Sequence, residues 1–115
     1  MLVSLARIDC ANIKDWDSFH DEFNRVFEFP DFYGRNMDAW IDCMTSIDTP
    51  DDGLSGIHCE RGGFLTIELD NVNTLNGDRS EYFEAITDCT AFVNWRRIEN
   101  GGKPVLSLSY YRDDD

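Results

Sequence analysis

The chain has few basic residues. Its 115 residues include 10 lysines and arginines against 23 aspartates and glutamates, which gives a net charge of −13. A surface this acidic repels the phosphates of DNA and RNA and attracts basic surfaces. We therefore expect the partner to be a basic protein, with no direct binding of nucleic acid.

Side chains that carry chemistry are also scarce. His20 and His58 are the only histidines, and neither stands in a nucleophile motif. His58 precedes Cys59, but no second ligand pair at zinc-finger spacing accompanies them. We expect no enzyme activity, no metal and no cofactor. His20 is expected on the polar side of its helix and His58 in a loop.

Long apolar runs are missing as well. No stretch approaches the length of a transmembrane helix, and the short run at residues 1–6 does not resemble a signal peptide. The four cysteines form no CxxC pair and fit buried free thiols in a reducing compartment; they are Cys10, Cys43, Cys59 and Cys89. We expect a cytoplasmic monomer that does not contact membranes.

Aromatic residues, by contrast, are plentiful, with eight Phe, four Tyr and three Trp. This content indicates a folded core, and the length fits one domain over residues 1–115. Strand-like runs at 2–8, 64–69 and 105–110 are separated by helical segments. The predicted fold is α/β, a single small domain with a three-stranded parallel sheet packed with helices.

Two of the helices have clear sequence signals. The first follows Asp15, a good N-cap, and its apolar stripe consists of Trp16, Phe19, Phe23, Val26 and Phe27. This leaves Asp17, Asp21, Glu22 and Arg25 facing water. For the last helix, Asp78 and Glu81 resemble a capping box, and the helix is expected to end near Asn100. We attribute Trp95, Arg96 and Arg97 to the C-terminal end of that helix, where arginines favour the dipole.

Residues 48–63 contain Pro50, four glycines and several aspartates, which is typical of a loop. We interpret this segment as a loop insertion, and the sequence leaves open whether it contacts a partner. The acidic tail at 113–115 is expected to fray.

The most informative run spans residues 29–45. Pro30 ends the preceding helix, Gly34 allows a turn, and Asn36 is a preferred N-cap. A helix is predicted over 37–45, with one apolar face formed by Met37, Trp40, Ile41 and Met44.

Asp38 and Asp42 lie four residues apart on the remaining face of this predicted helix. Two like charges at this spacing cost stability, so their presence suits a cationic partner. An acidic pair is most often a plain solvated face. It could also bind Mg²⁺ or act as acid and base, but no phosphate-binding loop or positioning group accompanies it.

Residues 29–45 resemble the barstar family of intracellular ribonuclease inhibitors. The shared pattern is Pro-acidic-aromatic-Tyr-Gly-X-Asn-hydrophobic-Asp, followed by Asp-Cys-hydrophobic-Thr. The resemblance implies that Asp38 and Asp42 occupy the cationic active site of a ribonuclease, with Asp42 inserted more deeply. The partner-binding residues it implies are Phe32, Tyr33, Asn36, Asp38, Ile41, Asp42, Thr45 and Glu81, with Glu84 as the weaker choice beside Glu81.

The chain departs from the family pattern at two places. Phe32 replaces a tyrosine, and Trp40 followed by Ile41 replaces a leucine followed by a tryptophan, which moves the large aromatic toward the core. The leading hypothesis is a bacterial immunity protein, of the toxin–antitoxin kind, that blocks a small extracellular-type ribonuclease. The alternative is an acidic adaptor that binds a basic protein other than a nuclease.

Overall fold

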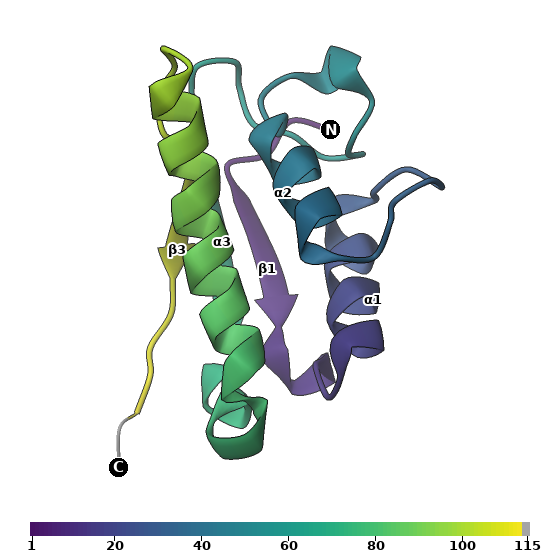
Figure 1. The fold of residues 1–115 in the computed structure, drawn as a ribbon, viewed down its shortest axis with the longest axis vertical. Coiled ribbons are helices and arrows are strands. Elements are labelled where there is room, and N and C mark those ends of the chain that lie inside the picture. The colour runs from purple at the N-terminus through teal and green to yellow at the C-terminus, as the bar shows by residue number, and fades with distance from the viewer. Residues whose placement is uncertain (114–115) are drawn as a thin grey trace.

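The computed structural model describes residues 1–113, which fold around a three-stranded parallel sheet (Figure 1). The strands are β1 (Leu5–Asp9), β2 (Leu65–Asp70) and β3 (Leu106–Ser109), with β2 in the centre. In the register, Ala6 lies opposite Ile67, which lies opposite Leu108 on the other side. The predicted α/β class and parallel sheet are confirmed.

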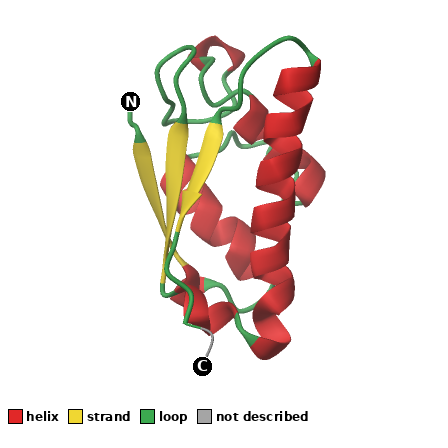
Figure 2. Ribbon diagram, turned by 90° about the vertical axis from the view of Figure 1, so that its left-hand side faces the viewer, coloured by secondary structure: helices red, strands yellow, loops and turns green. Residues whose placement is uncertain are grey.

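Three helices pack on one face of this sheet: α1 (Trp16–Phe27), α2 (Met37–Thr45) and α3 (Ser80–Glu99). Figure 2 shows all three on the same side of the strands, while the opposite face carries no helix within residues 1–113. Short 3₁₀ turns occur at Cys10–Asn12, Pro50–Asp52, Val72–Leu75 and Gly77–Arg79. The helices α2 and α3 lie side by side over the sheet (Figure 1).

The core lies between the sheet and the helices. Alternate residues of β2 point into it because side chains alternate across a strand. The largest fully buried side chains are Trp40, Phe19, Phe23, Phe27, Ile8, Ile13, Met44, Ile47, Leu65, Ile67, Leu75 and Ile86. The predicted stripe of α1 is confirmed at its three phenylalanines, whereas Trp16 is 40% exposed. Three cysteines are buried, Cys89 is half-buried, and all four are free thiols.

Helix α1 has the N-cap that the sequence predicts, but two of its polar residues are buried where the sequence predicts exposure. The Asp15 carboxylate accepts from the Ser18 N–H at 2.8 Å, and the Ser18 hydroxyl accepts from the Asp15 N–H. The expectation that Glu22 faces water is wrong, because it is buried and accepts hydrogen bonds from the Asp9 N–H and Arg25. The expectation that His20 lies on the polar side is also wrong, because it is buried too.

The last helix and the strands start later than the sequence predicts. The capping box at Asp78 and Glu81 does not form, because residues Gly77–Arg79 make a 3₁₀ turn and α3 begins at Ser80 without a side-chain cap. The helix ends at Glu99, close to the expected position. Strand β1 starts at Leu5, while Leu2 forms only an isolated bridge to His58.

Residues 48–63 contain one 3₁₀ turn and otherwise no helix or strand. The segment is nevertheless attached at both of its ends. Asp48 is buried and forms two hydrogen bonds with Arg97 of α3, at 3.0 and 2.9 Å. The Cys59 N–H donates to the Ile47 carbonyl, and His58 bonds to Met1 and Val3 through its backbone. Of the predicted frayed tail at 113–115, residues 114 and 115 lie outside the described chain.

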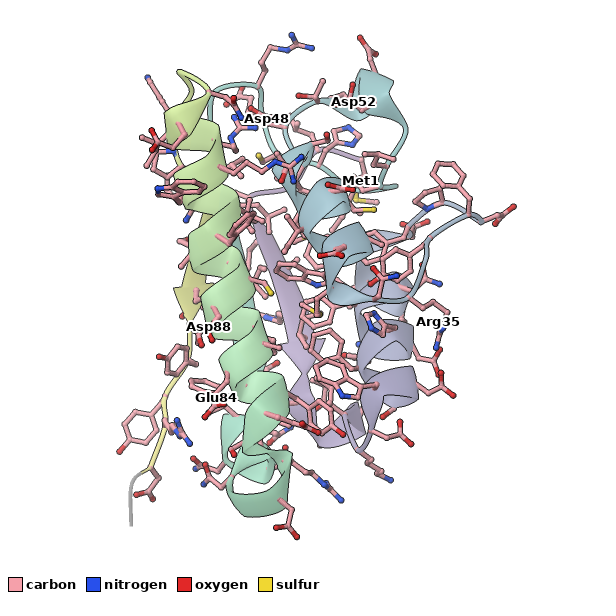
Figure 3. All side chains as sticks on the ribbon, in the orientation of Figure 1. Met1, Arg35, Asp48, Asp52, Glu84 and Asp88 are labelled. Carbon is pink, nitrogen blue, oxygen red and sulfur yellow. The ribbon has the colours of Figure 1, made fainter. Side chains whose placement is uncertain are left out.

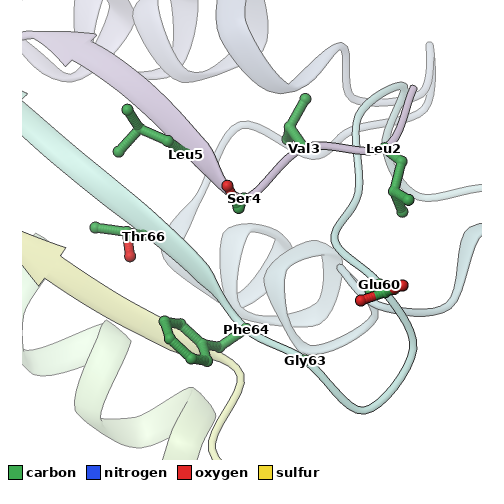
Figure 4. Close-up of a pocket in the computed structure, with 8 residues that line it drawn as sticks. All are labelled: Leu2, Val3, Ser4, Leu5, Glu60, Gly63, Phe64 and Thr66. Carbon is green, nitrogen blue, oxygen red and sulfur yellow. The ribbon is translucent and has the colours of Figure 1, made fainter.

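An apolar groove of about 690 Å³ opens where β1 and β2 begin (Figure 4). Its lining includes Leu2, Leu5 and Phe64, which are all exposed. Leu5 and Thr66 alternate with the inward residues Ala6 and Leu65, so the groove belongs to the helix-free side of the sheet. This groove is therefore on the opposite side of the sheet from α2.

Candidate partner-binding surface

The loop between α1 and α2 presents one aromatic side chain and folds the other inward. Phe32 is 77% exposed, whereas Tyr33 is half-buried, with its ring 4.5 Å from that of the buried Phe29. The Tyr33 hydroxyl lies 2.6 Å from Nδ1 of His20. Of these two residues that the resemblance implies as partner-binding, Phe32 therefore projects from the loop, whereas the Tyr33 hydroxyl is directed to His20.

His20 anchors this loop from inside the protein. Burial lowers the pKa of its imidazole, and the nearby Arg35 lowers it further, so the ring is neutral at pH 7. A helical spacing signal was present in the sequence, because His20 follows Trp16 by four residues and precedes Phe23 by three. His20 was expected on the polar side because histidine is a polar residue, although its spacing places it on the apolar stripe.

Two residues set the entry into α2. Arg35 adopts a left-handed backbone with φ of 53° and forms ion pairs with Asp17 and Asp21 of α1, at 3.2 and 2.9 Å. The sequence pointed to Gly34 as the unusual backbone position, but the left-handed residue is Arg35. Asn36 accepts from the Ala39 N–H at 2.8 Å and is therefore the N-cap that was predicted.

Helix α2 separates an apolar face from an acidic one. Trp40 is fully buried, and Ile41 is half-buried against the core, as the apolar spacing predicts. Asp38 and Asp42 are exposed on the other face. The Asp42 side chain is 62% exposed, and its Oδ1 pairs with an Arg96 guanidinium nitrogen of α3 at 3.0 Å. The two carboxylates are accessible to a partner, and one already has a cation beside it.

The C-terminal end of α2 is fixed by its own backbone and by α3. The Thr45 hydroxyl donates to the Ile41 carbonyl at 2.6 Å, and the Thr45 carbonyl accepts from Arg97 at 2.8 Å. Arg97 also holds Asp48, whose pKa burial would raise but whose hydrogen bonds with Arg97, Thr49 and Gly62 lower it overall. Arg96 and Arg97 thus pair with specific carboxylates, beyond the dipole role that the sequence suggested.

The acidic residue at the start of α3 is not brought to α2. Helix α2 packs beside α3, and Asp42 contacts Arg96, so α2 reaches the later half of α3. Glu81 precedes Arg96 by fifteen residues, a distance of about 22 Å along a helix. Figure 3 shows Asp88 and Glu84 on the flank of α3 away from α2.

Other kinds of site find little support among the described residues. Within residues 1–113, no group of three His, Cys, Asp or Glu side chains is placed to hold a metal ion. Over the same residues, no helix combines the length and the hydropathy that a membrane span needs. Burial raises the pKa of the Cys10 thiol to about 12 and of the Cys43 thiol to about 11, which makes both poor nucleophiles.

Comparisons with known proteins point in one direction. A protein from Bacillus subtilis (strain 168), named "Putative ribonuclease inhibitor YrdF", is 41% identical to this chain over 44 residues. The aligned part covers 37% of this chain and 48% of that protein, so the chain spans about half the length of this curated relative.

A family model gives a match over most of the chain. It is described as "Barstar (barnase inhibitor)", and it covers residues 3–106. The matched range contains β1, β2 and the first residue of β3. It also contains the exposed loop with Phe32 and the acidic face of α2. The chain therefore belongs to the barstar family, which is described by its member that inhibits barnase.

Proposed function

We propose that this protein inhibits a small basic ribonuclease by covering its active site with α2 and the loop before it. The observation that carries the proposal is the acidic face of α2, where Asp38 and Asp42 are exposed beside the projecting Phe32 in a chain of the barnase-inhibitor family. The biological role would be that of an immunity protein, which acts in the cytoplasm of the cell that makes the ribonuclease.

The acidic pair would replace the substrate phosphates. Ribonuclease active sites bind phosphate through cationic side chains, and carboxylates can make the same charge-assisted hydrogen bonds. Asp42 engages Arg96 through Oδ1 while most of its side chain stays exposed, so a cation of the partner can approach the other oxygen. Phe32 would lie at the edge of the contact and exclude water from it.

The net charge of −13 supports the encounter as well as the contact. A strongly acidic protein steers a basic partner toward itself, and this raises the association rate. Salt screens such steering over about 8–10 Å at physiological ionic strength, so association is expected to slow as salt is added. A rate that does not change with salt would argue against steering.

The direct test is to titrate the wild-type protein and Asp42→Ala against a panel of small secreted microbial ribonucleases that includes barnase, while RNA cleavage is followed. Glu60→Gln is the control, since it removes one exposed negative charge from the groove side of the sheet. We expect stoichiometric inhibition by wild type and Glu60→Gln.

Asp42→Ala is expected to lose about 2–5 kcal/mol of binding free energy with little change in stability. This general range draws in part on barnase and barstar, the namesake of the family. Equal losses of binding and thermal stability would contradict a role in the contact. Binding without loss of ribonuclease activity would support the adaptor alternative, and no inhibition of any panel member would refute the proposal.

A further inference from the structure

Three large apolar side chains lie exposed together on the later half of α3. Phe92 is 45% exposed, Trp95 is 56% exposed and Ile98 is 51% exposed. They recur at spacings of three residues, so neighbours lie about 60° apart around the helix and about 4.5 Å apart along it. The rings of Phe92 and Trp95 contact each other, with 5.7 Å between their centroids. We call these three residues the α3 patch.

The α3 patch lies on the side of its helix away from α2. Trp95 follows Asp88 by seven residues, about two helical turns, so both side chains leave α3 on the same side. Figure 3 shows Asp88 on the flank away from α2. Arg96, which contacts Asp42, is turned by about 100° from Trp95. The patch is therefore separate from the acidic face of α2.

We propose that the α3 patch is the contact between two copies of this chain, which pair through antiparallel α3 helices about a twofold axis at Trp95. An exposed apolar cluster of this kind marks an interaction surface. The inference goes beyond the proposed function, because neither the acidic pair of α2 nor the loop before it takes part.

The spacing of the patch fits a twofold contact. Such a contact uses the same surface on both copies, so that surface must be complementary to itself. Phe92 stands three residues before Trp95, and Ile98 stands three residues after it. An antiparallel pair of helices centred on Trp95 therefore places Phe92 of each copy against Ile98 of the other. The two Trp95 rings meet on the axis, where aromatic rings attract each other.

The charges around the patch fit the same register. Residues at equal distances before and after Trp95 face each other across the axis. Asp88 then falls opposite Gly102 of the other copy, just beyond the end of its helix, and Glu99 falls opposite Ala91. No two carboxylates meet in this arrangement. A centre shifted by one and a half residues toward the start of α3 would bring Asp88 opposite Glu99, where like charges repel.

The area of the contact indicates a weak dimer. Side chains of this size that are about half exposed have roughly 100 Å² each left to bury, or about 600 Å² for the six. Stable interfaces bury about 1,200 Å² or more. The net charge of −13 on each copy opposes the pairing as well. We therefore expect a transient dimer with a dissociation constant of about 0.1 mM.

The test is sedimentation equilibrium of the full chain from about 10 μM to about 1 mM, a range that brackets the expected dissociation constant. Wild type is expected to pass from monomer to dimer across this range. The dimer is expected to strengthen with added salt, because salt screens the repulsion between two acidic copies. This dependence is opposite in sign to the one expected for association with a basic ribonuclease.

Two variants place a charge in the facing pairs of the patch. Phe92→Lys and Ile98→Glu each break both pairs of a symmetric dimer, because every pair contains one of each residue. Each variant is expected to weaken dimerisation at least about 10-fold, since an unpaired charge would be buried in the contact. Phe64→Ser is the control, because it removes a 61% exposed aromatic from the helix-free side of the sheet. It is expected to stay within about twofold of wild type.

An equimolar mixture of Phe92→Lys and Ile98→Glu tests the register itself. In the mixed dimer, one facing pair is the original Phe92 with Ile98, and the other joins the introduced ammonium to the introduced carboxylate. The mixture is therefore expected to associate at least about threefold more tightly than either variant alone. Unfolding curves for each variant check that the fold is kept.

Three outcomes would overturn the inference. Wild type that stays a monomer up to about 1 mM at both low and high salt would exclude the dimer. A dimer that Phe92→Lys and Ile98→Glu leave intact would belong to another surface. A mixture that associates no more tightly than its separate components would exclude the twofold register. None of these measurements contains a ribonuclease, so the proposed function stands or falls on its own test.

Discussion

The carboxylates of this chain fall into two groups that differ in their surroundings. Glu22 and Asp48 are buried, and each is paired with an arginine and bonded to a backbone N–H. Asp38 and Asp42 lie exposed on α2. A buried carboxylate is retained only where its partners compensate for lost hydration. The comparison therefore separates charges that hold the fold from charges that are available to a partner.

The largest effect on folding is expected at Asp48. Replacing Asp48 by Ala leaves Arg97, whose side chain is 18% exposed, without its carboxylate. We expect a loss of about 3–5 kcal/mol in the free energy of unfolding, measured by urea denaturation. Asp52→Ala, an exposed residue of the same segment, is the control and is expected to change stability by less than about 0.5 kcal/mol. Equal effects of the two variants would show that the buried pair of Asp48 with Arg97 contributes no more to stability than an exposed carboxylate.

Glu22 provides the acid-dependent test. Burial would raise the pKa of Glu22, but hydrogen bonds from Arg25, the Asp9 N–H and Asn12 outweigh it and lower the pKa below 4.5. A lowered pKa means that Glu22 stabilises the fold above about pH 4.5 and loses that contribution as pH falls through the lower folded value. Glu22→Gln is expected to cost about 1.5–3 kcal/mol at pH 7 and to lose less further stability on acidification. A pH dependence equal to that of wild type would exclude this role.

The two aromatic residues of the loop allow the same comparison between a side chain that holds the fold and one that is available to a partner. Tyr33→Phe removes the hydroxyl bonded to the buried His20 and is expected to cost about 1–3 kcal/mol of stability with little effect on ribonuclease binding. Phe32→Ala is expected to weaken binding and leave stability unchanged, since Phe32 is exposed. Unfolding curves and inhibition titrations of both variants test these two expectations. A reversed pattern would show that Tyr33 is the contact residue.

The smallest effect is expected at Arg96, the cation beside Asp42. Because this ion pair is exposed, Arg96→Gln is expected to change stability by less than about 1 kcal/mol. The replacement removes a positive charge that repels the cations of the partner beside Asp42, so inhibition is expected to tighten by up to about fivefold. Weaker inhibition would indicate instead that Arg96 holds Asp42 in its binding conformation.

Local signals explain what could be predicted from the sequence. The bounds of α2 follow from the Asn36 cap and the apolar spacing, and both depend on residues close together in the chain. The α/β class followed from strands separated by helices. The site residues Asp38, Asp42 and Phe32 are exposed as their positions in the pattern indicate, whereas their contact with a partner stays a prediction.

Long-range pairing explains what was missed. Arg97 and Asp48 are separated by 49 residues, and Arg96 and Asp42 by 54, so nothing local reveals either pair. His20 and Glu22 were placed toward water by residue type, yet their partners Tyr33 and Asp9 lie 13 residues away. The capping box at Asp78 failed because the preceding Gly77 starts a 3₁₀ turn that takes up those residues.

The complete burial of Trp40 has an optical consequence. Its indole lies under α2, edge-on to the Phe23 ring at 5.6 Å, and within residues 1–113 its Nε1 has no hydrogen-bond partner. An indole in such a dry environment emits at shorter wavelengths than the exposed Trp95. The short-wavelength part of the intrinsic fluorescence therefore reports whether the core is intact, and the long-wavelength part comes from the exposed Trp16 of α1 and Trp95 of α3.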